Sequence, residues 1–226
     1  MELKTIAHIY TDFDEKFGIP RQSGLVPSLQ GRIVFEKEFR DPDCVRELDG
    51  YDYIWLLWHF SELPEDREYT PMVRPPRLGG NHKVGVFASR SPFRPNPLGL
   101  SCLKLERIEP ETECGPVIYV SGVDMLNATP VFDIKPYLPG TESHPLARGG
   151  YAGRHSGHCL EVADPDGQIK KVPESLREAL AGVLSQDPRP GYQNDSSRVY
   201  GISFAGYNIR FTVDGDTLTV VGAEPV

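Results

Sequence analysis

Short apolar runs separated by turn residues dominate the first 140 residues of the chain. Runs of about five to ten residues bounded by Gly, Pro, Asp and Asn predict β-strands, and many such strands in succession predict a barrel or a sandwich. The expected strands are 5–10, 32–35, 53–60, 83–88, 98–107, 117–123 and 131–134.

One short helix is expected among these strands. Asp41 suits the N-cap and Pro42 the first helical position, so the helix should run from Pro42 to about Gly50. The aromatic run that follows, from Tyr51 to Phe60, is expected in the barrel core or in a dimer contact, with base stacking as the alternative.

The pattern argues against a doubly wound nucleotide-binding fold. Such a fold needs strands that alternate with helices of about ten residues or more, and a glycine-rich phosphate loop. Neither G-x-G-x-x-G nor G-x-x-x-x-G-K-[ST] occurs here. The expected fold class is therefore mainly β, without a Rossmann sheet.

The last third of the chain changes character. Residues 139–166 are rich in Gly, His, Ser and Ala and lack a period, which predicts a long loop. Residues 173–184 place Leu176, Leu180, Val183 and Leu184 on one helical face. This arrangement predicts an amphipathic helix that begins at Pro173.

Two strands, 207–213 and 217–221, flank Asp214-Gly215-Asp216, a composition typical of a tight hairpin turn. A small α+β unit should therefore end the chain. The expected division is a β-barrel domain at 1–140, a glycine-rich linker at 141–166 and a C-terminal domain at 167–226.

Composition adds limits on location and partners. The four cysteines form no C-x-x-C pair, which favours a reducing, cytoplasmic setting over a disulfide framework. Neither a membrane-spanning run of about 20 apolar residues nor a secretory signal is expected. Net charge is −8, yet residues 74–94 carry five cations and no acid, so positive charge is concentrated locally.

A loop of arginines and prolines lies inside this basic segment. Pro92, Pro95 and Pro97 restrict the backbone around Arg90 and Arg94. Arginines held at low entropic cost suit bidentate recognition of anions. The simpler interpretation, a solvated surface loop, remains open.

The sequence gives little support for a metal site. His155, His158 and Cys159 offer three potential ligands within five residues, but they lie in the glycine-rich loop with no evident fourth ligand. We expect no metal.

The chain resembles the TrmO-type (TsaA-like or YaeB-like) family of tRNA methyltransferases. The segment Gly85–Ser101 is similar to the family signature, with Ser89 in place of Thr and Leu98 in place of Ile. Other family motifs occur in the same order: Pro20-Arg-Gln22, Val73-Arg-Pro-Pro-Arg-Leu-Gly-Gly80, Thr129-Pro130, Asp133-Ile-Lys-Pro-Tyr137 and Gln186-Asp-Pro-Arg-Pro-Gly-Tyr192.

This resemblance implies a single β-barrel that binds S-adenosylmethionine, a small C-terminal domain and a homodimer with the cofactor near the subunit interface. The implied reaction is methylation of N6 of threonylcarbamoyladenosine beside the anticodon of tRNA. The implied cofactor contacts are Pro20, Arg21, Gln22, Ser61, Glu62, Arg90, Leu100, Ser121, Gly122, Val123 and Asp124. The substrate-binding residues would be Arg74, Arg77, Lys83, Arg94 and Asn96, with the cations on tRNA phosphates.

The chemistry of the ligand suggests roles for some of these residues. Arg21 or Arg90 suits the cofactor carboxylate, and Asp124 suits its ammonium or sulfonium, although Asp124 could instead satisfy a turn. The acceptor nitrogen is a poor nucleophile, so a nearby group should take its proton. Asp133 or Tyr137 is the candidate, with an Asp133–Lys135 ion pair that merely orders the strand as the alternative.

Two departures from the family keep other functions open. Ser61-Glu62 stands where His-Gln is common, and Asn127-Ala128 stands where Asp-Gly is common. The rival interpretations are a methyltransferase with another substrate and a non-catalytic module that binds S-adenosylmethionine or RNA. A β-barrel interaction protein without either activity fits the motifs least well.

Overall fold

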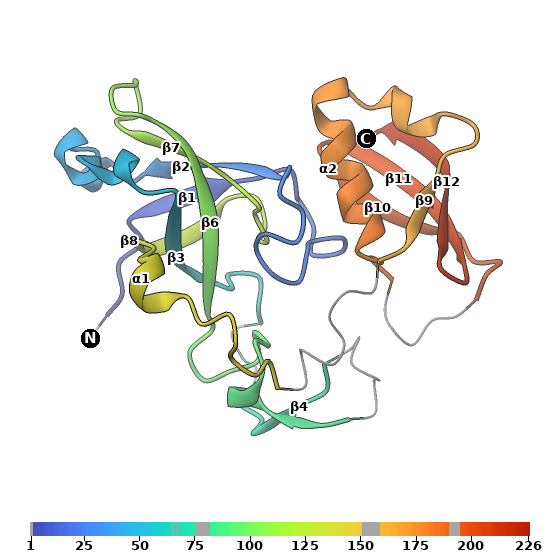
Figure 1. The fold of residues 1–226 in the computed structure, drawn as a ribbon, viewed down its shortest axis with the longest axis horizontal. Coiled ribbons are helices and arrows are strands. Elements are labelled where there is room, and N and C mark those ends of the chain that lie inside the picture. The colour runs from blue at the N-terminus through green and yellow to red at the C-terminus, as the bar shows by residue number, and fades with distance from the viewer. Residues whose placement is uncertain (1, 65, 67, 76–81, 151–158, 190–194) are drawn as a thin grey trace.

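The structure, a computed structural model, describes all residues except 1, 65, 67, 76–81, 151–158 and 190–194. Its larger part is a closed antiparallel barrel whose strands follow the order β1-β2-β7-β6-β3-β8 (Figure 1). These strands are β1 (Ala7–Tyr10), β2 (Gln30–Phe35), β3 (Tyr53–His59), β6 (Leu98–Glu109), β7 (Val117–Ser121) and β8 (Thr129–Pro136).

Side chains alternate between the barrel interior and its outer face. In β3, Ile54, Leu56 and Trp58 are buried, whereas the residues between them are partly exposed. Because successive side chains of a strand point to opposite faces, every second residue fills the core of a small barrel. The apolar runs of the sequence therefore become a packed interior rather than a channel.

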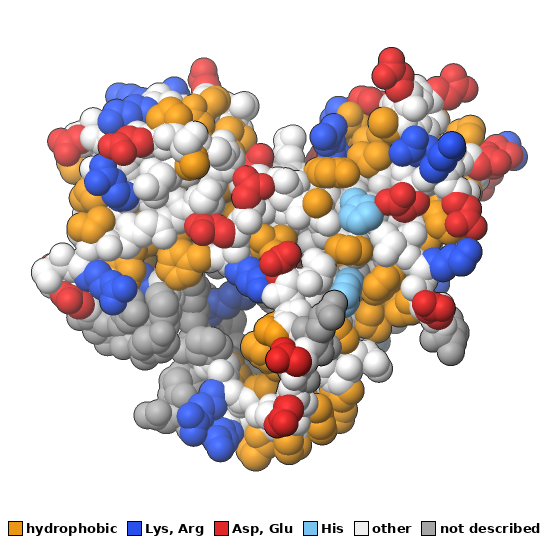
Figure 2. All heavy atoms as spheres, turned by 180° about the vertical axis from the view of Figure 1, so that it is seen from behind, with side chains coloured by type: hydrophobic (Ala, Val, Ile, Leu, Met, Phe, Trp, Pro, Cys, Tyr) orange, Lys and Arg blue, Asp and Glu red, His pale blue; other side chains and the backbone are white. Residues whose placement is uncertain are grey.

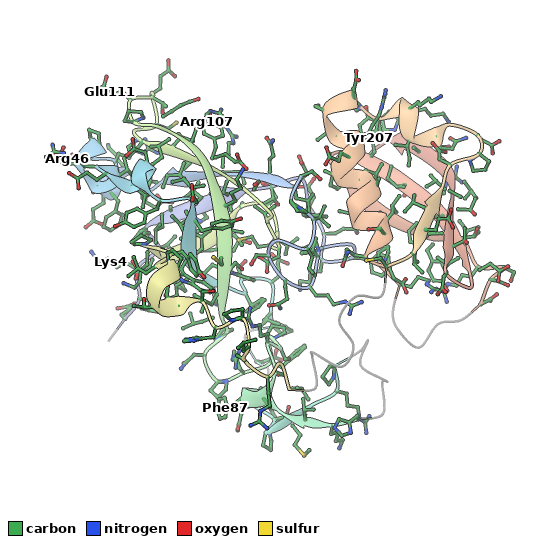
Figure 3. All side chains as sticks on the ribbon, in the orientation of Figure 1. Lys4, Arg46, Phe87, Arg107, Glu111 and Tyr207 are labelled. Carbon is green, nitrogen blue, oxygen red and sulfur yellow. The ribbon has the colours of Figure 1, made fainter. Side chains whose placement is uncertain are left out.

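The structure differs from the expected strand at 83–88. Only β5 (Val84–Gly85) is extended, and it pairs with β4 (Met72–Val73), while the 3-10 helix η4 (Val86–Ala88) follows directly. We call β4, β5 and η4 the arm, which extends below the barrel in Figure 1. Phe87, 75% exposed, lies on it and is labelled in Figure 3.

The expected helix at 42–50 is interrupted. After η1 (Lys37–Phe39), the chain forms two 3-10 helices, η2 (Pro42–Val45) and η3 (Leu48–Gly50). Asp41 caps η2 as expected, because its side chain accepts a hydrogen bond from the Asp43 N–H over 3.0 Å. η2 ends before Arg46, whose ψ of 131° is not helical, and Glu47 adopts a left-handed conformation with φ 64° directly before η3.

The C-terminal unit is a four-stranded sheet with a helix beside it. The sheet order is β10-β11-β12-β9, and β9 pairs in parallel with β12. Its elements are β9 (Glu161–Ala163), η6 (Gln168–Lys171), α2 (Glu174–Ser185), β10 (Tyr200–Phe204), β11 (Tyr207–Asp214) and β12 (Thr217–Pro225), preceded by the single turn α1 (Pro139–Glu142).

The fold class predicted from the sequence is confirmed. The helix predicted at 173–184 forms as α2, and the hairpin around Gly215 also forms. Leu180, Val183 and Leu184 of α2 are buried as expected. The division at 140 and 167 stays a prediction, although β9, inside the expected linker, joins the second sheet.

The C-terminal unit packs against the loop between β1 and β2. The Ala205 N–H donates to the Asp12 carbonyl over 2.9 Å, and the rings of Phe13 and Phe204 meet edge to face at 5.6 Å. A Cβ added to Gly182 of α2 would lie 2.5 Å from Val26 Cγ1, so this helix approaches the same loop closely. The second unit therefore supports the loop that carries Pro20, Arg21 and Gln22.

The described part of the chain contains neither a membrane-spanning helix nor a candidate metal cluster. Within the part of the chain that the structure describes, no helix is long and apolar enough to cross a membrane. The described residues also contain no group of three or more His, Cys, Asp and Glu side chains that could hold a metal ion. His155 and His158 lie outside the described residues.

Candidate active site

One end of the barrel carries a cavity of about 550 Å³. The end of β3, the start of β6, the segment after β7 and the start of β8 meet there, together with the loops that contain Arg21 and Arg90. We call it the first cavity. Its lining includes Lys16, Pro20, Arg21, Gln22, Trp58, Phe60, Ser61, Glu62, Arg90, Pro92, Phe93, Arg94, Leu100, Ser101, Asp124 and Thr129.

Serine side chains form hydrogen bonds to the backbone within the loop of arginines and prolines. The Ser89 hydroxyl accepts from the Ser91 N–H over 3.3 Å, and the Ser91 hydroxyl accepts from the Phe93 N–H over 3.2 Å. These local turns compete with regular structure and hold the backbone in a defined path. Arg90, inside this path, donates to the side-chain oxygen of Gln22.

A hydrogen-bond relay runs beneath the first cavity. Trp58 Nε1–H donates to Ser101 Oγ over 3.0 Å, and Ser101 Oγ–H donates to Asp124 Oδ1 over 2.6 Å. An indole nitrogen can only donate, so the single serine proton must point at the carboxylate. Both Ser101 and Trp58 are buried, and the relay therefore fixes one oxygen of Asp124 as an acceptor.

Burial raises the pKa of Asp124 from its ordinary value of 3.8 to about 6. The hydrogen bonds from Ser101 and from the backbone of Ser23, and the charge of Arg90, act in the opposite direction. A carboxylate that is costly to ionise without a partner favours a cation beside it. Asp124 is thus prepared to receive a positively charged group in the first cavity.

Gly99 makes room for the first member of the relay. It pairs with Trp58 across β3 and β6, and a Cβ at Gly99 would lie 2.1 Å from the indole. No real side chain tolerates such a distance, so only glycine fits at this register position. The glycine in the Leu98-Gly-Leu-Ser101 segment is therefore needed for packing under the first cavity.

The structure brings together most of the predicted cofactor contacts. Eight of them line the first cavity: Pro20, Arg21, Gln22, Ser61, Glu62, Arg90, Leu100 and Asp124. Ser121, Gly122 and Val123 are buried behind it instead. Gly122 donates to the Leu29 carbonyl over 2.8 Å and accepts from the Gly24 N–H over 2.9 Å, which connects Asp124 to the loop after β1.

The predicted substrate-binding residues are spread over a wider surface. Arg94 lines the first cavity, whereas Arg74 and Lys83 belong to the arm and its flanks. Asn96 is exposed. It lines neither the first cavity nor a neighbouring cavity between the Arg90 loop and residues 72–74. Arg77 lies outside the described residues.

Asp133 and Tyr137 do not line the first cavity. Asp133 faces a different hollow near Phe35 and Cys44, and its Oδ2 lies 3.0 Å from Lys135 Nζ. The ring of Tyr137 contacts those of Tyr53 and Trp55 at 6.2 and 6.0 Å. Their catalytic role stays a prediction.

The sequence did not predict a role for Ser101, and it predicted Trp58 only as part of an aromatic run in the barrel core or in a dimer contact, with base stacking as the alternative. Ser101 occupies an inward-facing position of β6, between the buried residues Gly99 and Leu103. A buried hydroxyl needs a partner, so a serine at an inward position of a strand was the available signal. Phe93 also lines the first cavity, although the sequence predicted only polar contacts from the loop of arginines and prolines.

The fold and the first cavity define a class of protein. It is a small β-barrel with an appended α+β unit, in which one barrel end gathers a partly buried carboxylate, several arginines and apolar walls into a ligand cavity. The chain belongs to the tRNA-methyltransferase O family. The model of the family's N-terminal domain matches residues 8–143, and that of its C-terminal domain matches residues 162–226.

Several known proteins are similar to this chain over most of its length. The tRNA (adenine(37)-N6)-methyltransferase of Escherichia coli K12 is 36% identical over 99% of this chain and 98% of its own. A protein with the same description from Eikenella corrodens is 46% identical over 73% of this chain and 92% of its own. The crystal structure of TrmO from Pseudomonas aeruginosa superposes with a TM-score of 0.77 at 28% identity, covering 99% of this chain and 98% of that one.

Proposed function

We propose that the protein transfers a methyl group from S-adenosylmethionine to N6 of the adenine at position 37 of tRNA, beside the anticodon. The observation that carries this proposal is the first cavity, which the loop of arginines and prolines lines together with the partly buried Asp124. The activity named for the Escherichia coli and Eikenella corrodens relatives supports the same reaction. The acceptor adenosine is proposed to carry a threonylcarbamoyl group on N6 already.

The lining of the first cavity fits this cofactor. The ligand combines a sulfonium and an ammonium with a carboxylate and an adenine, so it needs anions, cations and apolar walls within one site. Asp124 and Glu62 supply the negative charges, and Arg21 and Arg90 supply the positive ones. A volume of about 550 Å³ lies within the usual range for sites of small ligands.

The protein's own residues act mainly by positioning. The bound cofactor supplies a methyl group on a positively charged sulfur, which is open to in-line displacement. The ionised Asp124, held by Ser101, would orient the cationic part, while Arg90 would hold the carboxylate. Fixed donor geometry accounts for a large part of the acceleration in such transfers, and no covalent intermediate with the protein is needed.

Asp133 and Tyr137 are proposed to accept the N6 proton of the substrate. Neither lines the first cavity of its own chain, so this role requires that a second copy brings them to it. We therefore propose a homodimer, as the family resemblance implies. A molar mass of one chain in light scattering at working concentration would contradict both proposals.

The cations of the arm and loop would contact the tRNA. Lys83 and Arg94 lie in the basic segment 74–94, which contains no acidic residue. Phosphate contacts of this kind supply affinity without reading sequence. We also propose a cytoplasmic location, which a tRNA substrate supports.

Comparison of two tRNA pools tests the reaction. Wild-type protein is incubated with labelled S-adenosylmethionine and tRNA from cells that make threonylcarbamoyladenosine or from cells that cannot make it. The proposal predicts label in the modified pool only. Equal labelling of both pools would point to another substrate, and cofactor binding without label in either would favour the non-catalytic module.

A further inference from the structure

A second cavity of about 560 Å³ lies against the first. The two share a wall made of Arg21, Gln22, Arg90, Pro92 and Phe93. Beyond this wall the second cavity extends toward the arm, where Met72, Val73 and Arg74 line it. The hydrogen bond from Arg90 to Gln22 lies in the partition between the two spaces.

The two cavities differ in charge. The first contains Asp124 and Glu62 beside its arginines. Among the described residues that line the second, three are arginines and none is Asp or Glu. Concave sites lined by one sign of charge concentrate ligands of the opposite sign, so the second cavity suits an anion.

Arg74 is the member of this set with the fewest competing contacts. Arg90 donates a hydrogen bond to Gln22 and interacts electrostatically with Asp124. Arg21 interacts electrostatically with Asp187. In the part of the chain that the structure describes, Arg74 has no ion pair. Its planar guanidinium is therefore available for two parallel hydrogen bonds to a carboxylate or a phosphate.

The two cavities adjoin, as the donor and acceptor sites of a methyl transfer must. A donor in one space and an acceptor in the next can meet in line only where the two spaces adjoin. Phe93, 49% exposed, belongs to that wall and offers a face on which an extruded base can stack. Apolar side chains gather at the arm just beyond it, as the lower part of Figure 2 shows, with Lys and Arg side chains beside them and Asp and Glu side chains among them.

We propose that the second cavity receives the acceptor nucleoside and that Arg74 binds a carboxylate carried on the N6 substituent of its base. This proposal rests on the proposed function and deepens it, because it assigns the acceptor side of the site to residues of this chain. The threonylcarbamoyl group fits the requirement, since it ends in a carboxylate. The other source of an anion, a backbone phosphate, is an outcome of the test.

The test uses binding, so that it does not depend on turnover. An anticodon stem-loop is prepared with the threonylcarbamoyl group as the free acid or as its methyl ester, which keeps the shape and removes the charge. Dissociation constants are measured in the presence of S-adenosylhomocysteine for wild type, Arg74→Gln and Lys83→Gln. Cofactor affinity and thermal unfolding are measured for each variant as a check on folding.

Wild type should bind the acid about tenfold or more tightly than the ester, as expected for a charge-assisted hydrogen bond. Arg74→Gln should lose this preference, while Lys83→Gln should weaken both ligands equally and keep it. Equal weakening of acid and ester by Arg74→Gln would assign Arg74 to a phosphate and overturn the proposal, as would no effect. Absence of methyl transfer despite an intact acid preference would instead count against the proposed function alone.

Discussion

Ser101 and Asp124 are joined by a hydrogen bond of 2.6 Å whose direction is determined by Trp58. Because the Trp58 indole N–H donates to the Ser101 oxygen, Ser101 donates its one hydroxyl proton to the Asp124 carboxylate. The result is a partly buried carboxylate whose Oδ1 is held by Ser101 in the lining of the first cavity. The behaviour of ligands in the first cavity should follow the ionisation of this group.

Cofactor affinity should depend on pH with a midpoint near the pKa of Asp124, which burial raises to about 6. Only the ionised carboxylate attracts a cation, so affinity is full above this pH and falls about tenfold per pH unit below it. Calorimetry from pH 5 to 8 measures the profile. Asp124→Asn should bind weakly at all of these pH values with a flat profile, and a flat profile in wild type would contradict the assignment.

Ser101→Ala should move that midpoint upward by about one pH unit, because it removes a hydrogen bond that favours the ionised form. Affinity should therefore drop more at pH 6.5 than at pH 8. A purely structural serine would lower affinity by the same factor at both pH values. That outcome would exclude a positioning role for Ser101.

Gly99→Ala should destabilise the protein by about 1 to 3 kcal/mol, since its Cβ would collide with the Trp58 indole. The displaced indole should also weaken cofactor binding through the relay. Denaturant unfolding measures the first effect. Gly50→Ala is the matched control, because a Cβ there meets nothing within 4 Å, and it should change stability by less than about 1 kcal/mol.

The larger features of this molecule could be predicted from the sequence because they depend on local patterns. Alternation in β3 and β6, the helical face of α2 and the Asp-Gly turn at Gly215 each act over a few residues. The family resemblance likewise implied cofactor contacts at Arg21, Arg90 and Asp124, and the fold brings these three residues to one cavity.

Contacts between distant segments could not be predicted in the same way. The Ser101 hydroxyl meets Asp124, 23 residues later, because β6 pairs antiparallel with β7 in a register, Lys104 opposite Ser121, that places Asp124 across from Ser101. The break between η2 and η3 includes Glu47, a left-handed residue that no glycine marks. Asp133 and Tyr137 appeared as a single row in sequence, but that row lies away from the first cavity.

Binding of tRNA should weaken as salt rises, since each phosphate contact releases counterions. Replacing Lys83 by Gln should reduce the slope of log affinity against log salt by about 1. Arg107→Gln is the control, because Arg107 lies on the barrel, away from the arm (Figure 3), and pairs with Glu109. An unchanged slope for Lys83→Gln would remove Lys83 from the tRNA surface.

The most direct measurement of the central claim is the position of the transferred methyl group. Threonylcarbamoylated tRNA is incubated with labelled S-adenosylmethionine and wild-type protein or Arg90→Ala, then digested to nucleosides. The account predicts that wild type puts the label on N6 of the modified adenosine beside the anticodon, and that Arg90→Ala loses most of this activity. Label on any other nucleoside, or full activity in Arg90→Ala, would contradict the assignment of the first cavity.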